Sequence, residues 1–168
     1  MTKITPLLKG LIAGLAMTGL NLLLISFNRA SNAQYLFYLL YAGAIAWTLI
    51  DYSKSENYVP NFGSIFGQGF RCFIIITLVT VVFVGIYSSI EDTDKLGEEI
   101  RKELIKENEQ SIKLGKGPKR LPGEIEMEVA NFKKHFVTTN ISLATFSTLI
   151  TGAIFTAAGA GILLMRKK

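Results

Sequence analysis

Hydrophobic and polar positions divide the chain into four long apolar stretches separated by polar segments. The apolar stretches span residues 7–27, 35–50, 70–90 and 137–165. A helix of about 20 residues crosses the hydrocarbon core of a bilayer, and only the second stretch is shorter than that. The third stretch is rich in valine and isoleucine, but an isolated strand in lipid would leave its backbone groups unpaired. We therefore predict an all-α fold built on a four-helix transmembrane bundle.

The segment 91–136, between the third and fourth stretches, is strongly charged. It holds 11 of the 13 acidic residues and 10 of the 18 basic residues. Two patterns of helical spacing flank a Gly- and Pro-containing turn at 115–123. The apolar positions of the two patterns are Leu96, Ile100 and Leu104, then Ile125, Val129, Phe132 and Phe136. We predict an extramembrane helical hairpin within a single membrane domain 1–168, with Leu96, Ile100 and Leu104 packed against Val129, Phe132 and Phe136.

Composition and charge agree with a membrane protein. Hydrophobic residues make up 49% of the chain and charged residues 18%, whereas soluble domains carry about a quarter charged residues. The net charge of +5 arises mainly near the ends of the apolar stretches, so it does not form the basic face of a nucleic-acid-binding protein. By the positive-inside rule we expect a multi-pass membrane protein with cytoplasmic termini and the hairpin on the opposite side of the membrane.

Charged residues near the stretch ends have specific expected roles. Lys9 could extend to the membrane surface, and with Lys3 it could also belong to a signal peptide cleaved near Ala33. The apolar stretch is long for a signal peptide, so we expect an uncleaved helix. Arg71 is a candidate partner for Asp51, although both side chains could be solvated. Segment 60–69 is expected to form an elbow in the membrane interface.

Small residues recur every four positions in the first and fourth stretches. They are Gly10, Gly14 and Thr18 in the first, and Thr148, Gly152, Thr156 and Ala160 in the fourth. Such rows let two helices approach closely in lipid, where no hydrophobic gain distinguishes helix contact from lipid contact. We expect the two rows to pack on each other. Contact of the fourth-span row with another membrane protein, or with a second copy, is the alternative.

The sequence offers no constellation typical of catalysis or metal binding. His135 is the only histidine and Cys72 the only cysteine, so neither a metal cluster nor a Ser-His-Asp set is expected. The glutamates of 98–107 alternate with basic residues, which is typical of a solvated helix face. We expect no enzymatic activity, no cofactor and no metal.

The order of parts resembles a known family. An N-terminal span precedes a Tyr-rich span, a Phe66-Gly67-Gln68-Gly69-Phe70-Arg71 entry to the third span, a charged excursion and a Lys-ended fourth span. The whole chain resembles the domain-of-unknown-function 4199 family of four-helix bacterial membrane proteins, found mostly in Bacteroidetes. The resemblance implies four spans in a bacterial inner membrane, with the hairpin in the periplasm, and carries no assigned activity.

Two functions follow as expectations. The first is a non-catalytic accessory or scaffold subunit that packs through the small-residue face of the fourth span and presents the hairpin to a partner. The alternative is a small lipid- or solute-handling protein. It would use a groove with an expected lining of Tyr35, Tyr38, Tyr41, Asn21 and Asn140.

Overall fold

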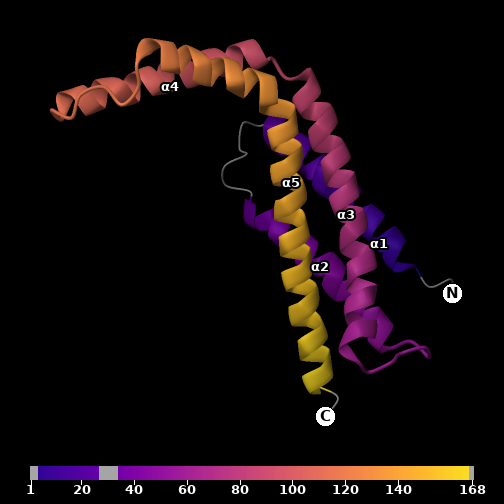
Figure 1. The fold of residues 1–168 in the computed structure, drawn as a ribbon. Coiled ribbons are helices and arrows are strands. Elements are labelled where there is room, and N and C mark those ends of the chain that lie inside the picture. The colour runs from indigo at the N-terminus through magenta and orange to yellow at the C-terminus, as the bar shows by residue number, and fades with distance from the viewer. Residues whose placement is uncertain (1–3, 27–33, 167–168) are drawn as a thin grey trace. The chain divides into compact units, whose positions relative to one another are not determined.

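The polar breaks in the sequence separate five helices in the computed structural model, which describes residues 4–26 and 34–166. These described residues contain no strand. The helices are α1 (Pro6–Ser26), α2 (Gln34–Ser53), α3 (Phe62–Ile90), α4 (Thr93–Lys113) and α5 (Pro122–Arg166) (Figure 1). The all-α prediction is confirmed.

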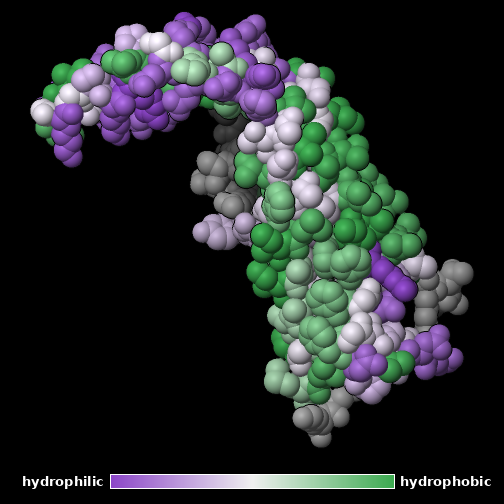
Figure 2. Space-filling view, viewed as in Figure 1, coloured by the Kyte–Doolittle hydropathy of each residue, from purple (hydrophilic) through white to green (hydrophobic). Residues whose placement is uncertain are grey.

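Four of the helices, α1, α2, α3 and α5, are long and apolar enough to cross a membrane. Large apolar side chains cover much of their outer surface, as Figure 2 shows for α3 and α5. Val82 and Phe146, for example, are 60% and 66% exposed. Such a surface is unfavourable in water and suits lipid, so the fold indicates a membrane protein.

Two helices extend further than the apolar stretches that predicted them. α3 begins at Phe62, directly after Asn61, so the expected helical positions at 62–69 belong to α3 itself and do not form a separate elbow. The Asn61 side chain accepts a hydrogen bond from the Ser64 amide (2.7 Å), which caps this end. α5 begins at Pro122, and its 45 residues include both the second hairpin helix and the fourth span.

The ends of the hairpin helices follow ordinary capping chemistry. The Asp92 carboxylate accepts from the amides of Asp94 (3.1 Å) and Lys95 (3.2 Å), as its position before α4 predicts. After α4, Gly115 and Gly117 both have a φ of 72°, a conformation that side chains with a Cβ rarely adopt. Pro122 opens α5, where its missing N–H costs nothing.

The chain divides into two compact units. The first comprises residues up to Val84 and from Leu143 onward, and the second comprises Gly85–Ser142. The first unit has a core that includes Tyr41, Ile45, Leu49, Ile65, Cys72, Phe73, Ile76 and Ala160. The second has a smaller core of Leu104, Ile125 and Val129.

Candidate functional site

The glycines of α1 lie against α3. A Cβ at Gly10 would fall on the carbonyl oxygen of Cys72, and a Cβ at Gly14 would lie 2.9 Å from the Cβ of Val79. The nearest neighbours of both glycines thus belong to α3, which corrects the expectation that this row packs on the fourth span. A row of small residues can pack against more than one helix, so the sequence alone did not identify α3 as the partner of α1.

The small-residue row of α5 packs inside the first unit. A Cβ at Gly152 would lie 2.6 Å from the ring of Phe73 and 2.6 Å from the hydroxyl of Tyr41. Thr156 is fully buried beside Gly69, where an added Cβ would lie 2.5 Å from the Thr156 Cγ2. Ala160 is also fully buried. The row therefore faces α2 and α3 of its own chain.

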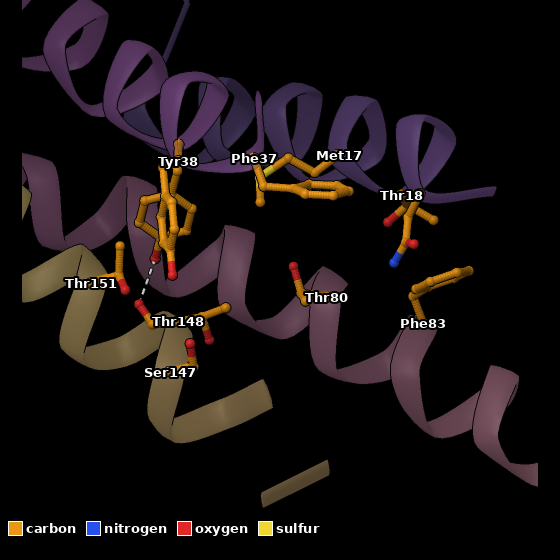
Figure 3. Close-up of a pocket in the computed structure, with 11 residues that line it drawn as sticks. Met17, Thr18, Phe37, Tyr38, Thr80, Phe83, Ser147, Thr148 and Thr151 are labelled. Carbon is orange, nitrogen blue, oxygen red and sulfur yellow. Dashed lines mark hydrogen bonds between the residues drawn. The ribbon is translucent and has the colours of Figure 1, made fainter. Parts of the chain in front are cut away.

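A cavity of about 240 Å³ lies between the four helices of the first unit (Figure 3). Its apolar lining is Met17, Phe37 and Phe83. The polar lining consists of Thr18, Asn21, Tyr38, Tyr41, Thr80, Ser147, Thr148 and Thr151. Among the residues that the structure describes, the lining contains no Asp, Glu, Lys, Arg or His. Figure 3 shows Ser147, Thr148 and Thr151 on α5 facing the Tyr38 side of the cavity, with Thr80 on α3 beside them.

A hydrogen bond between two lining residues joins α2 to α5. The Tyr41 hydroxyl donates to the Thr148 carbonyl at 2.9 Å, across the α2–α5 contact. The Thr148 hydroxyl donates to the carbonyl of Ala144 (2.7 Å), one helical turn earlier. Such bonds to the preceding turn are the usual way to satisfy a hydroxyl in a membrane helix.

Other polar side chains of the cavity do not form a hydrogen bond to the preceding helical turn. Among the described residues, those of Thr18, Asn21, Thr80, Ser147 and Thr151 form no hydrogen bond. In an apolar environment an unpaired hydroxyl or amide costs about 1–3 kcal/mol. These groups therefore favour water or a hydrogen-bonding ligand in the cavity.

The groove expected from the tyrosines is formed in part. Asn21, Tyr38 and Tyr41 line the cavity. Tyr35 is 83% exposed and is not part of the lining. Asn140 belongs to the second unit, where it donates to the Ser88 hydroxyl at 3.1 Å. The hydroxyls of α3 and α5 were missed as lining residues, although Thr80, Ser147 and Thr151 stand out as polar residues in apolar stretches.

A buried lysine forms a second polar group in the first unit. Lys9 is 2% exposed, pairs with the Asp51 carboxylate and lies 4.9 Å from the centre of the Trp47 ring. The Lys9 side chain is therefore held by a carboxylate and an aromatic face of α2. The Asp51–Arg71 pairing is wrong, since Asp51 contacts Lys9 and Arg71 is exposed.

In the second unit, α4 packs antiparallel to the first part of α5. Lys133 pairs with Asp94 at 2.8 Å, and Arg101, further along α4, pairs with Glu126, which is earlier in α5. Of the expected packing residues, Leu104 and Val129 are buried and Ile100 packs against them. Leu96, Phe132 and Phe136 are half-buried, and the two phenylalanine rings lie 5.2 Å apart. Ile125, outside the expected contact, completes the core.

The loop at the end of this hairpin is held by polar contacts. The Asn108 side chain accepts from the amides of Lys119 and Arg120 (both 3.0 Å) and donates to the Arg120 carbonyl (2.7 Å). Arg120 also pairs with Glu107 (2.8 Å) and Glu128 (2.7 Å). The hydrogen bond from Arg120, with the charge of Lys119, lowers the pKa of Glu107 below its ordinary value.

The same loop presents an apolar and basic surface, which we call the hairpin tip (residues 110–123). Ile112, Leu114 and Leu121 are 56%, 72% and 62% exposed. Lys113, Lys116, Lys119 and Arg120 lie among them, and the segment contains no acidic residue. Exposed apolar side chains grouped beside basic residues are typical of an interaction surface.

His135 and Cys72, the single histidine and the single cysteine of the chain, do not line the cavity. Within the described part of the chain, no group of three His, Cys, Asp or Glu side chains could hold a metal ion. His135 is exposed. Cys72 is fully buried, with its thiol 3.8 Å from the Ala44 carbonyl.

Together, the helix order and the apolar surface define a small helical membrane protein with four candidate spans. Residues 8–166 match a family model described as a protein of unknown function, DUF4199, so the chain belongs to that family. The resemblance inferred from the sequence is thereby confirmed. Searches of curated proteins and of solved structures find no match.

Proposed function

We propose that this protein is a non-catalytic accessory or scaffold subunit of a bacterial inner-membrane complex, which presents its second unit to a partner. In this proposal α1, α2, α3 and α5 cross the membrane, and residues 91–136 form a hairpin outside it. The hairpin tip makes the contact. The small-residue row of α5 packs inside the chain, so the proposal moves the partner interface from that row to the tip.

The observation that carries this proposal is the composition of the tip. Three large apolar side chains are exposed beside Lys113 and Lys116, while Lys119 and Arg120 pair with glutamates of the flanking helices. Asn108 and Arg120 hold the backbone of the loop, so a partner would meet a preformed surface. The charge of the tip favours an acidic protein surface as that partner.

The distribution of basic residues supports an orientation within this proposal. Lys54 and Arg71 lie beside spans on one side, as do Lys3, Lys9, Arg166 and the terminal lysines. Arg29 lies in the short loop on the other side, together with the 10 basic residues of the hairpin, which its 11 acidic residues outnumber. The positive-inside rule then assigns both termini to the cytoplasm and the hairpin to the periplasm. A reporter that is active only after export, fused after Lys168, should stay inactive. Activity there would reverse the orientation.

Binding to a partner can be tested with the full-length protein. Affinity purification in mild detergent, with quantitative mass spectrometry, would compare wild type with the tip double variant Leu114→Ser and Leu121→Ser. Met127→Ser is a matched control, because Met127 is similarly exposed (60%) on α5 but lies outside the tip. We expect one partner to be lost with the tip variant and kept with the control. Equal recovery in all three samples would contradict the proposal.

The cavity supports a second candidate function, handling of a lipid or neutral solute. Such a role needs polar groups within the span region, and the cavity supplies hydroxyls from α1, α3 and α5. Reconstituted vesicles would test it through the transbilayer movement of fluorescent lipids. Movement no faster than in protein-free vesicles would count against this candidate.

A further inference from the structure

A second pocket of the first unit lies beside the buried lysine of α1. It has a volume of about 270 Å³, and we call it the Lys9 pocket. Among the described residues its charged lining is Lys9, Asp51 and Lys54, and its other polar lining includes the Gln68 amide. Unlike the cavity lined by hydroxyls, this pocket therefore carries charges of both signs.

Asp51 and Lys54 line this pocket without forming an ion pair with each other. Asp51 pairs with Lys9 through Oδ2, is 51% exposed, and its Oδ1 accepts no hydrogen bond from a described residue. Lys54 is exposed, and its ammonium forms no ion pair within the described part of the chain. The pocket therefore offers a carboxylate oxygen and an ammonium, each able to bind an opposite charge.

Two further groups of the lining have unused hydrogen-bond donors. A lysine ammonium has three N–H groups, and that of Lys9 donates to Asp51 alone among the described residues. The Gln68 side chain is half-buried and forms no hydrogen bond in the same part of the chain. Lys9 belongs to α1, Gln68 to α3, and Lys54 to the loop after α2. Donors from three segments thus surround one space, which suits an oxyanion with several acceptor oxygens.

The Lys9 pocket lies near the ends of two candidate spans. At 1.5 Å per residue, Lys9 is about 5 Å from the Pro6 end of α1, and Asp51 is about 3 Å from the Ser53 end of α2. The 21 residues of α1 extend about 31 Å, close to the thickness of the hydrocarbon core. When α1 and α2 cross the membrane, these helix ends therefore meet the headgroup layer. Side chains on a helix also point toward its N-terminus, which brings the Lys9 ammonium closer to the Pro6 end.

We infer that the Lys9 pocket binds a zwitterion with a primary ammonium and a phosphodiester, as in the headgroup of phosphatidylethanolamine. The ammonium donates to Asp51, and the phosphate accepts from Lys54 and Gln68. A quaternary ammonium has no N–H to donate, and a headgroup without a cation would place its negative charge near Asp51 uncompensated. The inference rests on α1 and α2 crossing the membrane, as in the proposed function, and not on the hairpin tip. Failure of partner binding at the tip would therefore leave it standing.

Lipid binding to the full-length protein in detergent, followed by native mass spectrometry, tests the charge pattern. The probes are phosphatidylethanolamine, phosphatidylcholine and phosphatidylglycerol with the same acyl chains. We expect one tightly bound phosphatidylethanolamine, and apparent Kd values at least about tenfold higher for the other two lipids. Similar Kd values for all three would overturn the inference, because lipids that merely surround the helices bind without regard to their headgroup.

A chain-free compound distinguishes a lipid from a soluble ligand at the same site. Glycerophosphoethanolamine carries the same ammonium and phosphodiester without acyl chains. If it displaces the bound lipid only in large excess, the ligand of the pocket is the lipid. If it binds as tightly as the lipid, the zwitterion site stands and its ligand is soluble.

Two basic residues of the chain provide a matched pair of variants. Lys54→Gln removes the cation that binds the phosphate, so the apparent Kd of phosphatidylethanolamine should rise about tenfold. Arg71→Gln is the control, because Arg71 is exposed three residues after Gln68 and does not line the pocket, and its Kd should stay within about twofold of wild type. Equal Kd values for the two variants would overturn the inference. Thermal unfolding without lipid checks that both fold, and the comparison of the three lipids on the wild-type chain decides the question without any variant.

Discussion

The Lys9 ammonium and the Asp51 carboxylate form an ion pair whose partners differ in exposure, 2% for Lys9 and 51% for Asp51. The loss of Asp51 and the loss of Lys9 should therefore lower the free energy of unfolding by different amounts. Without Asp51, a buried ammonium remains, whereas without Lys9 the carboxylate can be hydrated where it stands.

We expect Asp51→Asn to lower the free energy of unfolding by about 1–3 kcal/mol and Lys9→Met by less than about 1 kcal/mol. Methionine keeps much of the buried apolar stem, which is why the second change is mild. Thermal unfolding of the purified protein in detergent would measure both. Equal destabilisation, or a larger effect of Lys9→Met, would show that the pair is not the reason for the lysine's burial.

The close approach of α1 and α3 at Gly10 should make that position intolerant of a side chain. Gly10→Ala is expected to destabilise the protein by about 1–3 kcal/mol, because the new Cβ would meet the Cys72 backbone, which cannot move independently of α3. Gly19→Ala is the matched control on the same helix, with no atom within 4 Å of a Cβ. Unfolding in detergent should leave the control near wild type. A harmless Gly10→Ala would contradict the helix contact.

The contact of α5 with α2 and α3 should depend on Gly152. Gly152→Leu places a large side chain against the Phe73 ring and the Tyr41 hydroxyl, and should separate these helices. Gly161→Leu, where a Cβ meets nothing within 4 Å, is the control. Crosslinking between cysteines at positions 69 and 156, in a Cys72→Ser background, should fall in Gly152→Leu alone. Unchanged crosslinking in Gly152→Leu would show that the small-residue row of α5 does not pack against α2 and α3.

The hairpin should be more sensitive at Val129 than at Phe132. Val129 is 5% exposed and contacts the small core, so Val129→Asp would bury a carboxylate without a partner. Phe132 is half-buried, so Phe132→Asp removes less packing. Limited proteolysis of residues 91–136 should be fastest for Val129→Asp, while membrane insertion persists. Greater sensitivity of Phe132→Asp would shift the core toward α5 residues nearer the span.

The loop of the hairpin tip should be pH-dependent. Because Arg120 lowers the pKa of Glu107, their pair is fully formed above the ordinary glutamate range and is lost as pH falls through the lowered pKa. Hydrogen exchange of amides 108–121, corrected for its intrinsic pH dependence, should therefore speed up as the pH falls below the ordinary glutamate range. Glu107→Gln should remove much of this dependence, and Glu109→Gln, a neighbouring exposed residue, should not. If Glu107→Gln left the pH profile unchanged, another titrating group would be responsible for it.

Sequence patterns predicted the positions of the helices better than their partners. Apolar length located all four candidate spans, and Asp92 and the glycines near 115 located the ends of α4. Packing partners depend on three-dimensional fit, which a row such as Gly10 and Gly14 leaves open. Lys9 was assigned to the surface because lysines near span ends usually extend there. Its burial depends on Asp51 and Trp47, from another helix, which no local pattern near Lys9 contains.

The contact of α1 with α3 has a consequence for the order in which the protein is made. Helix α1 leaves the ribosome first, and α2 supplies the Asp51 and Trp47 that bind Lys9. The glycine face of α1 has no partner until α3 has also been synthesised and inserted. A nascent chain that ends after α2 would therefore hold a paired lysine beside an unoccupied helix groove, which other membrane helices or an insertion chaperone could fill.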